Sequence, residues 1–171
     1  MWLELLKRVF NASVLLMLGV YFLQKKARKL NQTEVRLLAS YFESSLLKNA
    51  AVVEGVVPFW LHKKMAGVVV RHIVFLRKPL VLNHLQLRDS KLVISEEVLQ
   101  YHPQVYLNDI EILAHELVHV AQFSKGMTIF KYIWASRHGY TQNPYELEAY
   151  AKAAQIKHAY QQSLFKKVST K

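Results

Sequence analysis

The chain has 171 residues, 52% of them hydrophobic, with only 5 glycines and 4 prolines, which favours one globular domain with an ample core over a disordered chain. It contains no cysteine. Disulfides and thiolate metal sites are therefore excluded, and any zinc must take histidine and carboxylate ligands. The formal net charge of +11 favours anionic partners, either a lipid surface or nucleic acid.

Residues 1–30 are predicted to form a separate hydrophobic and basic helix. Its apolar run, Val9–Leu23, is flanked by basic residues on both sides. As a helix this run covers about 22 Å, against roughly 30 Å for a hydrocarbon core, although snorkelling lysines and local thinning can close such a gap. We expect residues 1–29 to be either a membrane anchor or a helix that packs on the domain surface. A cleaved signal peptide is disfavoured, because no small-x-small cleavage site follows.

The charge flanking this run also predicts an orientation. The heavier positive flank lies on its C-terminal side, so a spanning helix would leave a membrane-associated catalytic domain in the cytoplasm. Without an anchor, the expectation is a soluble cytoplasmic protein.

Residues 31–171 are predicted to form the main domain. Asn31 and Glu34 form a capping-box pattern that opens a helix to about Leu47. Strands are predicted from the β-branched stretches at 51–57 and 68–76, and turns with one or two short strands at 80–94. A helical turn at 60–65 and a short helix at 95–100 complete this middle part.

The stretch Ala114–Gln122, AHELVHVAQ, is the most informative in the chain. Asn108 is predicted to cap its helix, with Glu111 completing a capping box, and Gly126 is predicted to end it. Apolar residues cover nearly the whole circumference between these ends, so we expect a buried helix. Burying histidines and a carboxylate there is costly unless they are paired or bind a metal.

This stretch contains the pattern His-Glu-x-x-His. On a helix, His115 and His119 stand about one turn apart and can converge on one ion, while Glu116 can reach a water held by that ion. The pattern therefore predicts two zinc ligands and a carboxylate base that deprotonates the zinc-bound water. The alternative is an ordinary core helix with hydrogen-bonded histidines.

Two further helices are predicted downstream. A short helix with an apolar face ends at Gly139, and a last helix opens with Asn143 as cap and Pro144 at its first position and runs to about Phe165. The apolar face of the short helix is formed by Ile129, Phe130, Ile133 and Trp134.

A hydrolytic zinc site usually has three protein ligands and an open position. A third histidine six residues after His119 is excluded, because Lys125 stands there. The only glutamates or aspartates after Glu116 are Glu146 and Glu148, so one of them is expected to be the third ligand. The alternative is that both are solvent-facing helix residues, or that Glu146 only caps the helix. The two lie about 200° apart on the helix. The face of Glu146 continues through small and aromatic residues and that of Glu148 through polar ones, which favours Glu146.

The segments HELVHVAQF and NPYELEAYA, with Gly139-Tyr140 between them, resemble a bacterial family of small zinc metallopeptidase domains, some found with extracellular contractile injection systems. More distantly, they resemble the gluzincin clan, which includes thermolysin and the membrane proteases of the CAAX prenyl endopeptidase type. The resemblance implies Glu146 as the zinc ligand and a substrate peptide that adds to the sheet edge near Val68–Leu76. The clan places an aspartate four residues after this glutamate to orient a ligand histidine, and here Tyr150 stands instead.

These observations predict an α+β fold in which a small sheet from residues 51–94 packs on the HExxH helix and the C-terminal helix. The predicted function is a zinc-dependent metallopeptidase that hydrolyses peptide bonds of a peptide or protein substrate through a zinc-activated water. His115, His119 and Glu146 would bind Zn²⁺, Glu116 would be the base, and Tyr140 or His138 would stabilise the oxyanion.

Two alternatives remain open. One is a zinc-binding scaffold or partner-binding domain that has lost hydrolysis, motivated by Tyr150. The other is a basic nucleic-acid or lipid-binding protein with incidental histidines. No specific nucleic acid is expected, because the basic residues form no recognised reading motif.

Overall fold

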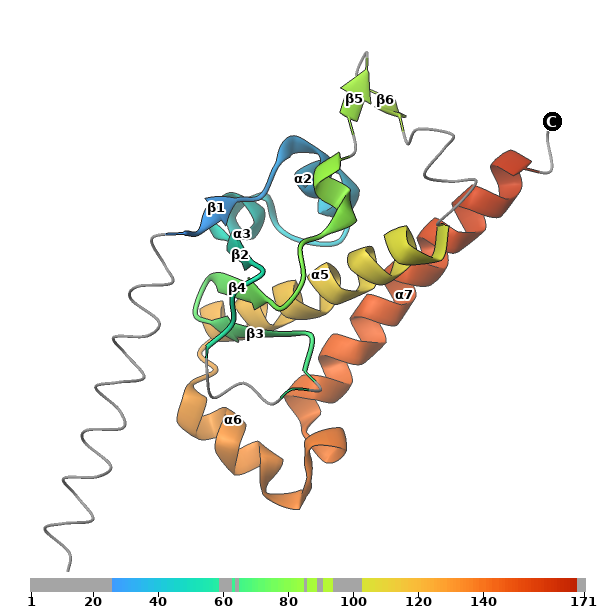
Figure 1. The fold of residues 1–171 in the computed structure, drawn as a ribbon. Coiled ribbons are helices and arrows are strands. Elements are labelled where there is room, and N and C mark those ends of the chain that lie inside the picture. The colour runs from blue at the N-terminus through green and yellow to red at the C-terminus, as the bar shows by residue number, and fades with distance from the viewer. Residues whose placement is uncertain are drawn as a thin grey trace, which may run out of the picture.

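The computed structural model describes residues 26–58, 63, 65–84, 86–88, 91–93 and 103–168. Within them, a four-stranded sheet packs against two long helices, so the predicted α+β fold is confirmed (Figure 1). The apolar run Val9–Leu23 lies outside the described residues, as do the helix predicted at 95–100 and most of the helical turn predicted at 60–65. Among the described helices, none is long and apolar enough to cross a membrane.

The sheet has the strand order β1-β2-β4-β3, with the bounds Arg28–Lys29, Ala51–Glu54, Ile73–Leu76 and Gly67–Val70. The central strands β2 and β4 are parallel, and each edge strand is antiparallel to its neighbour. The central strands are rich in valine and isoleucine, whose branched side chains suit a sheet that is buried on both faces. Gly55, with φ of 73°, ends β2.

Two strand assignments differ from the sequence-based prediction. The single strand expected at 68–76 is a hairpin of β3 and β4, because the chain reverses at Arg71, which adopts the left-handed region with φ of 59°. Arg28 and Lys29, assigned from the sequence to the N-terminal helix, instead form β1 and pair with β2. The Arg28 side chain holds this strand in place through ion pairs with Glu34 and Glu54.

The helix predicted from Asn31 to about Leu47 is two shorter helices. The capping box of Asn31 and Glu34 is confirmed, but α2 (Gln32–Leu38) ends early and α3 (Ser44–Asn49) follows after a turn. The turn places the Tyr41 ring 6.4 Å from the ring of Tyr160 on the last helix. The interruption between α2 and α3 thus coincides with a contact between residues far apart in the sequence, which local residue spacing could not reveal.

The short strands predicted at 80–94 are confirmed for the described backbone. The 3-10 helix η1 (Val81–His84) precedes a two-stranded sheet of β5 (Gln86–Arg88) and β6 (Lys91–Val93). The Asp109 carboxylate accepts a hydrogen bond from the backbone N–H of Val81, which ties η1 to the following helix.

Helix α5 (Pro103–Ser124) carries the His-Glu-x-x-His pattern and starts earlier than predicted. Asn108 is not its cap but lies inside it, where its side chain accepts hydrogen bonds from Gln104 and Lys157. The helix extends because Tyr106 and Leu107 are buried and continue its apolar surface. The predicted end is confirmed, since Gly126 has φ of 94° and its N–H donates to the carbonyl of Phe123.

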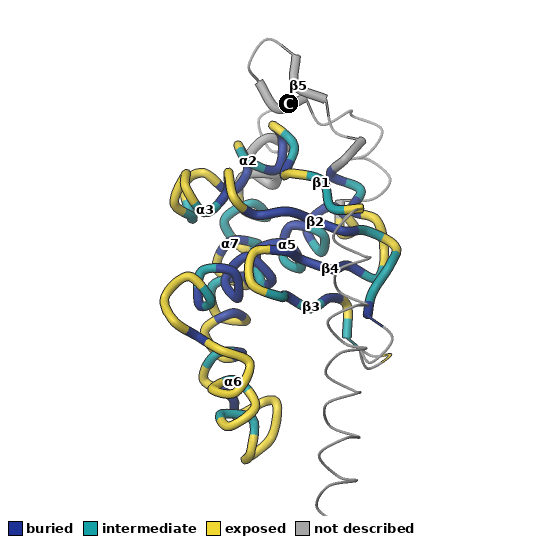
Figure 2. Tube along the Cα trace, turned by 90° about the vertical axis from the view of Figure 1, so that its left-hand side faces the viewer, coloured by how far each residue is buried: buried dark blue, intermediate teal, exposed yellow. Residues whose placement is uncertain are grey.

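The chain then forms α6 (Ile129–Ala135), the 3-10 turns η2 (Ser136–His138) and η3 (Tyr140–Gln142), and α7 (Pro144–Val168). Asn143 accepts a hydrogen bond from the N–H of Tyr145, as its predicted capping role requires. Helices α5 and α7 pack side by side and antiparallel along much of their length (Figure 1). Helix α6 protrudes below the sheet (Figure 2).

The main core lies between the sheet and the α5–α7 pair. Alternate residues of the central strands, Val52 and Val74, point into it. Their neighbours Val53 and Phe75 belong to a second buried cluster, formed with Ala51 and Ile73, on the other face of the sheet. Both faces of the central strands are therefore buried, and Val69 of β3 belongs to the main core, so β3 packs against α5.

Candidate metal centre

Two helices bring three metal-binding side chains together. His115 and His119 project from one face of α5, as their four-residue spacing requires, and Glu146 projects toward them from the first turn of α7. The two Nε2 atoms lie 3.2 Å apart. The Glu146 carboxylate contacts both nitrogens: Oε2 lies 3.3 Å from Nε2 of His115, and Oε1 lies 3.3 Å from Nε2 of His119. These three residues lie close together and could bind a metal ion.

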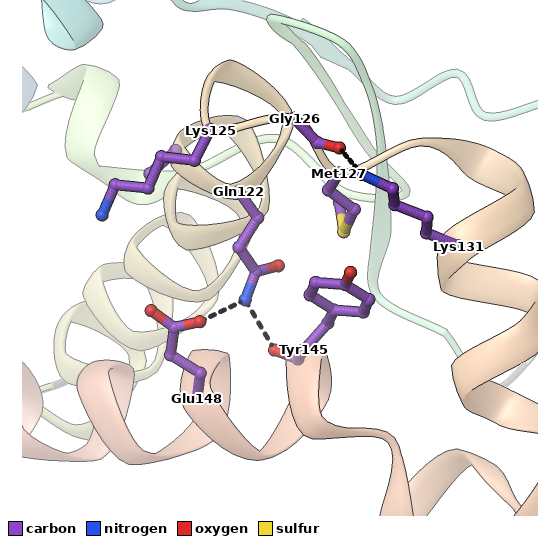
Figure 3. Close-up of a pocket in the computed structure, with 8 residues that line it drawn as sticks. Gln122, Lys125, Gly126, Met127, Lys131, Tyr145 and Glu148 are labelled. Carbon is purple, nitrogen blue, oxygen red and sulfur yellow. Dashed lines mark hydrogen bonds between the residues drawn. The ribbon is translucent and has the colours of Figure 1, made fainter.

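Gln122 fixes the orientation of His119. The amide Nε2 of Gln122 donates to the carbonyl of Tyr145 and to the carboxylate of Glu148, at 3.0 and 2.9 Å (Figure 3). Its Oε1 atom can therefore only accept, so the His119 Nδ1–H donates to it, over 2.8 Å. The neutral His119 ring then presents the lone pair of Nε2 to the centre of the cluster.

This arrangement calls for a cation at the centre. The lone pair of His119 Nε2 faces an oxygen of Glu146, and two acceptors at 3.3 Å repel unless a proton or a metal ion lies between them. Oε2 of Glu146 is also buried and has no hydrogen-bond partner. A buried carboxylate oxygen without a partner is costly, and a metal ion would satisfy it. The donor set therefore fits a bound metal ion.

Tyrosine hydroxyls support the Glu146 carboxylate. The Tyr132 hydroxyl of α6 donates to Oε1 of Glu146 over 2.5 Å, and the Tyr140 hydroxyl also interacts with this carboxylate. Burial alone would raise the pKa of Glu146, but its interactions with the two histidines and the two tyrosines hold that pKa well below its usual value. Glu146 thus remains an anion although it is buried, as a metal ligand must.

Glu116 lies beside the cluster in a different environment. It is only 5% exposed, and burial raises its pKa. The neighbouring histidines lower the pKa in part, and the result is a pKa of about 7. A carboxylate with this pKa can both accept and return a proton near neutral pH. Glu116 interacts electrostatically with all three candidate ligands, so it lies near them on α5.

The edge strand β3 approaches Glu116 closely at Gly67. A Cβ atom added to Gly67 would lie 2.8 Å from Oε1 of Glu116 and 2.9 Å from the carbonyl oxygen of Phe75. Both distances are shorter than real carbon contacts, so only glycine fits without a shift. The sequence does not reveal this constraint, because it depends on how the sheet packs on α5.

The structure confirms the proximity of most predicted site residues and separates others. His115, His119 and Glu146 come together, and Glu116 interacts with them electrostatically. Glu148 is exposed on α7 and contacts Gln122. Tyr140 reaches the site, where its hydroxyl interacts with Glu146 and Tyr150. His138 is exposed on η2 and takes no part in the metal-binding cluster found among the described residues.

Tyr150, the departure from the gluzincin pattern, packs on His115 with ring centroids 4.5 Å apart. Its ring therefore covers a candidate ligand histidine. Sequence reasoning missed Gln122 and Tyr132. The three-residue spacing of Gln122 from His119 on one helix is the local signal that could have found the first.

No protein-family model, curated protein or solved structure matches this chain.

Proposed function

We propose that this protein is a zinc-dependent metallopeptidase. The observation that carries the proposal is the convergence of His115, His119 and Glu146. The two histidine Nε2 atoms lie 3.2 Å apart, and each lies 3.3 Å from a different oxygen of the Glu146 carboxylate. In a tetrahedral site with bonds of 2.0–2.1 Å, neighbouring ligand atoms lie about 3.3–3.4 Å apart. Each of these separations is close to that distance, which supports zinc as the metal, and three protein ligands leave the fourth position open, as in hydrolytic zinc sites.

A bound zinc ion supplies a Lewis acid that acidifies water and polarises a carbonyl group. Glu116 accepts a proton from the attacking water and then delivers it to the leaving amine of the substrate. Its pKa of about 7 suits both steps. His119 is held in the ligating tautomer by Gln122, and Tyr132 holds the Glu146 carboxylate. Tyr140, half-exposed beside Glu146, is the residue we expect to donate to the developing oxyanion.

The position of β3 suggests how a peptide would bind. β3 is an edge strand, and its Gly67 lies directly beside Glu116. A substrate peptide that pairs with the outer edge of β3 in an extended conformation would pass in front of Glu116 and the metal. This arrangement favours extended, unfolded segments of protein over folded substrates.

The experiment is cleavage of an unfolded protein such as reduced casein by the full chain, purified without a histidine tag and supplied with zinc. New N-termini are identified by mass spectrometry. The matched control is Glu116→Gln, which keeps size and hydrogen bonding but cannot accept the proton. We expect the wild type to cut, and the variant to lose at least about 100-fold in rate while keeping its zinc. Equal cutting by both would indicate another base or a contaminating protease. Full zinc occupancy without cutting by the wild type would instead favour a zinc-binding scaffold.

A further inference from the structure

Helix α6 exposes a broad apolar face that the proposed peptidase chemistry does not use. No residue of α6 is buried. The exposed fractions are 51% for Ile129, 86% for Phe130, 61% for Ile133 and 70% for Trp134. At 100° per residue, these four side chains span about 140° of the helix surface. Figure 2 shows α6 as a largely exposed protrusion. A contiguous apolar face of this kind marks an interaction surface.

The other side of α6 is anchored to the metal centre. Tyr132 points away from the apolar face and donates its hydroxyl to Glu146, and its ring stacks on that of Tyr145 at 6.3 Å. Thr128 caps the helix by accepting from the N–H of Lys131. The orientation of α6 is thus held from its inner side, and its outer face is presented to a partner in a fixed direction.

The charge around this face selects the partner. Residues 117–145 contain Lys125, Lys131 and Arg137 but no aspartate or glutamate. All three cationic side chains belong to exposed residues, and the Arg137 guanidinium lies 4.9 Å over the ring of Trp134. Tryptophan and phenylalanine beside lysine and arginine are typical of helices that lie in the headgroup region of a bilayer.

A second copy of this chain suits the face less well. Two α6 faces placed against each other would bring like charges together, with no carboxylate from the same segment to neutralise them. An anionic lipid surface offers both a negative headgroup layer and an apolar interior. The sequence also contains a second apolar stretch with basic flanks, Val9–Leu23, whose composition suits the same kind of surface.

We infer that the outer face of α6, formed by Ile129, Phe130, Ile133 and Trp134, docks into the interfacial region of a bilayer that contains anionic lipids. The apolar side chains enter the acyl boundary, while Lys131 and Arg137 contact headgroup phosphates. Because Tyr132 links the same helix to Glu146, docking holds the candidate metal centre close to the membrane surface.

The test uses the full chain, whose lack of cysteine allows a single nitroxide label at any chosen position. Phe130→Cys and Ile133→Cys place the label on the outer face of α6. Ser40→Cys, exposed in the turn after α2, is the matched control away from α6. Each labelled protein is added to vesicles of phosphatidylcholine, with or without phosphatidylserine, and collisions with oxygen and with a water-soluble nickel chelate are measured by electron paramagnetic resonance.

With phosphatidylserine present, labels at 130 and 133 should lose most of their nickel collisions and gain oxygen collisions, while the label at 40 should not change. Adding Lys131→Glu and Arg137→Glu together should return the label at 133 to water. Persistent nickel access at 130 and 133 on vesicle-bound protein would overturn the inference. Equal insertion into neutral vesicles would also overturn it, as would protection that rises with protein concentration without vesicles. The measurement requires neither zinc nor hydrolysis, so it is independent of the proposed function.

Discussion

The Nδ1 nitrogen of His119 lies 2.8 Å from the Oε1 oxygen of Gln122, three residues further along the same helix. Glu148 and the carbonyl of Tyr145 fix the direction of the Gln122 amide, and the amide fixes the tautomer of the histidine. A glutamine of the same helix thus orients His119, while Tyr150 packs on the other histidine, His115.

Replacing Gln122 with alanine should therefore weaken zinc binding by about 10–100-fold, the usual effect of losing the partner of a ligand histidine. Competitive titration against a chromophoric chelator measures the affinity. Nitrogen NMR of the His119 ring in the metal-free protein should show a mixture of tautomers in the variant and one tautomer in the wild type. Gln155→Ala, on the exposed side of α7, is the control and should change neither reading. An unaltered tautomer in Gln122→Ala would refute this positioning role.

The two glutamates at the start of α7 should differ sharply in their effect on metal affinity. Glu146 is 1% exposed and touches both histidines, so Glu146→Ala should lower zinc affinity by orders of magnitude. Glu148 acts only through Gln122, so Glu148→Ala should lower it by a few-fold. The same competitive titration ranks the two variants. The reverse order would reassign the ligand.

Gly67→Ala should disturb the site from the sheet side. The added methyl group would meet both Glu116 and the backbone of Phe75, so either the carboxylate or the strand β3 must move. We expect peptide hydrolysis to fall at least about tenfold and stability to drop by about 1–3 kcal/mol, as for other overpacked sites, with zinc still bound. Chemical denaturation and a cleavage assay measure the two effects. Val68→Ala, which removes volume from the same strand, should retain the normal position of Glu116. Unchanged activity in Gly67→Ala would show that this close approach is unimportant.

Two truncations, of residues 1–25 and of residues 1–29, should have different effects on membrane attachment and stability. Removal of residues 1–25 should abolish salt-resistant membrane attachment, because Val9–Leu23 is lost, and should leave the domain folded. Removal of residues 1–29 should also cost about 2–4 kcal/mol, since Glu34, a buried carboxylate, loses its partner Arg28. Membrane fractionation in high salt and thermal unfolding measure these outcomes. Salt-resistant attachment of the shorter truncation, or its unfolding, would contradict the anchor.

Local geometry explains why the candidate site was largely predictable. Four-residue spacing on a helix places His115 and His119 together whatever the tertiary structure, and opposite helix faces distinguish Glu146 from Glu148. The contacts of Tyr132 and Gly67 were not predictable. Each depends on the approach of a separate element, α6 or β3, whose position is set by packing across the domain rather than by any nearby residue.

The fold was predictable in class but less so in its boundaries. The capping box at Asn31 and the end of α5 at Gly126 are local signals and were predicted correctly. The start of α5 was misplaced, because burial of Tyr106 outweighed the capping tendency of Asn108. The reversal at Arg71 was missed, since arginine is an uncommon residue for a left-handed turn position and carries no turn signal.

Metal analysis of the full chain, purified without a histidine tag, tests the central claim most directly. Plasma mass spectrometry should find one zinc ion per chain in the wild type, since three ligands and an open position form a complete hydrolytic site. A His115→Ala, His119→Ala double variant should carry almost none, and Glu148→Ala should carry nearly the wild-type amount. Absence of stoichiometric zinc from the wild type after equilibration with zinc, or equal zinc in the double variant, would contradict the metal centre on which the proposed function rests.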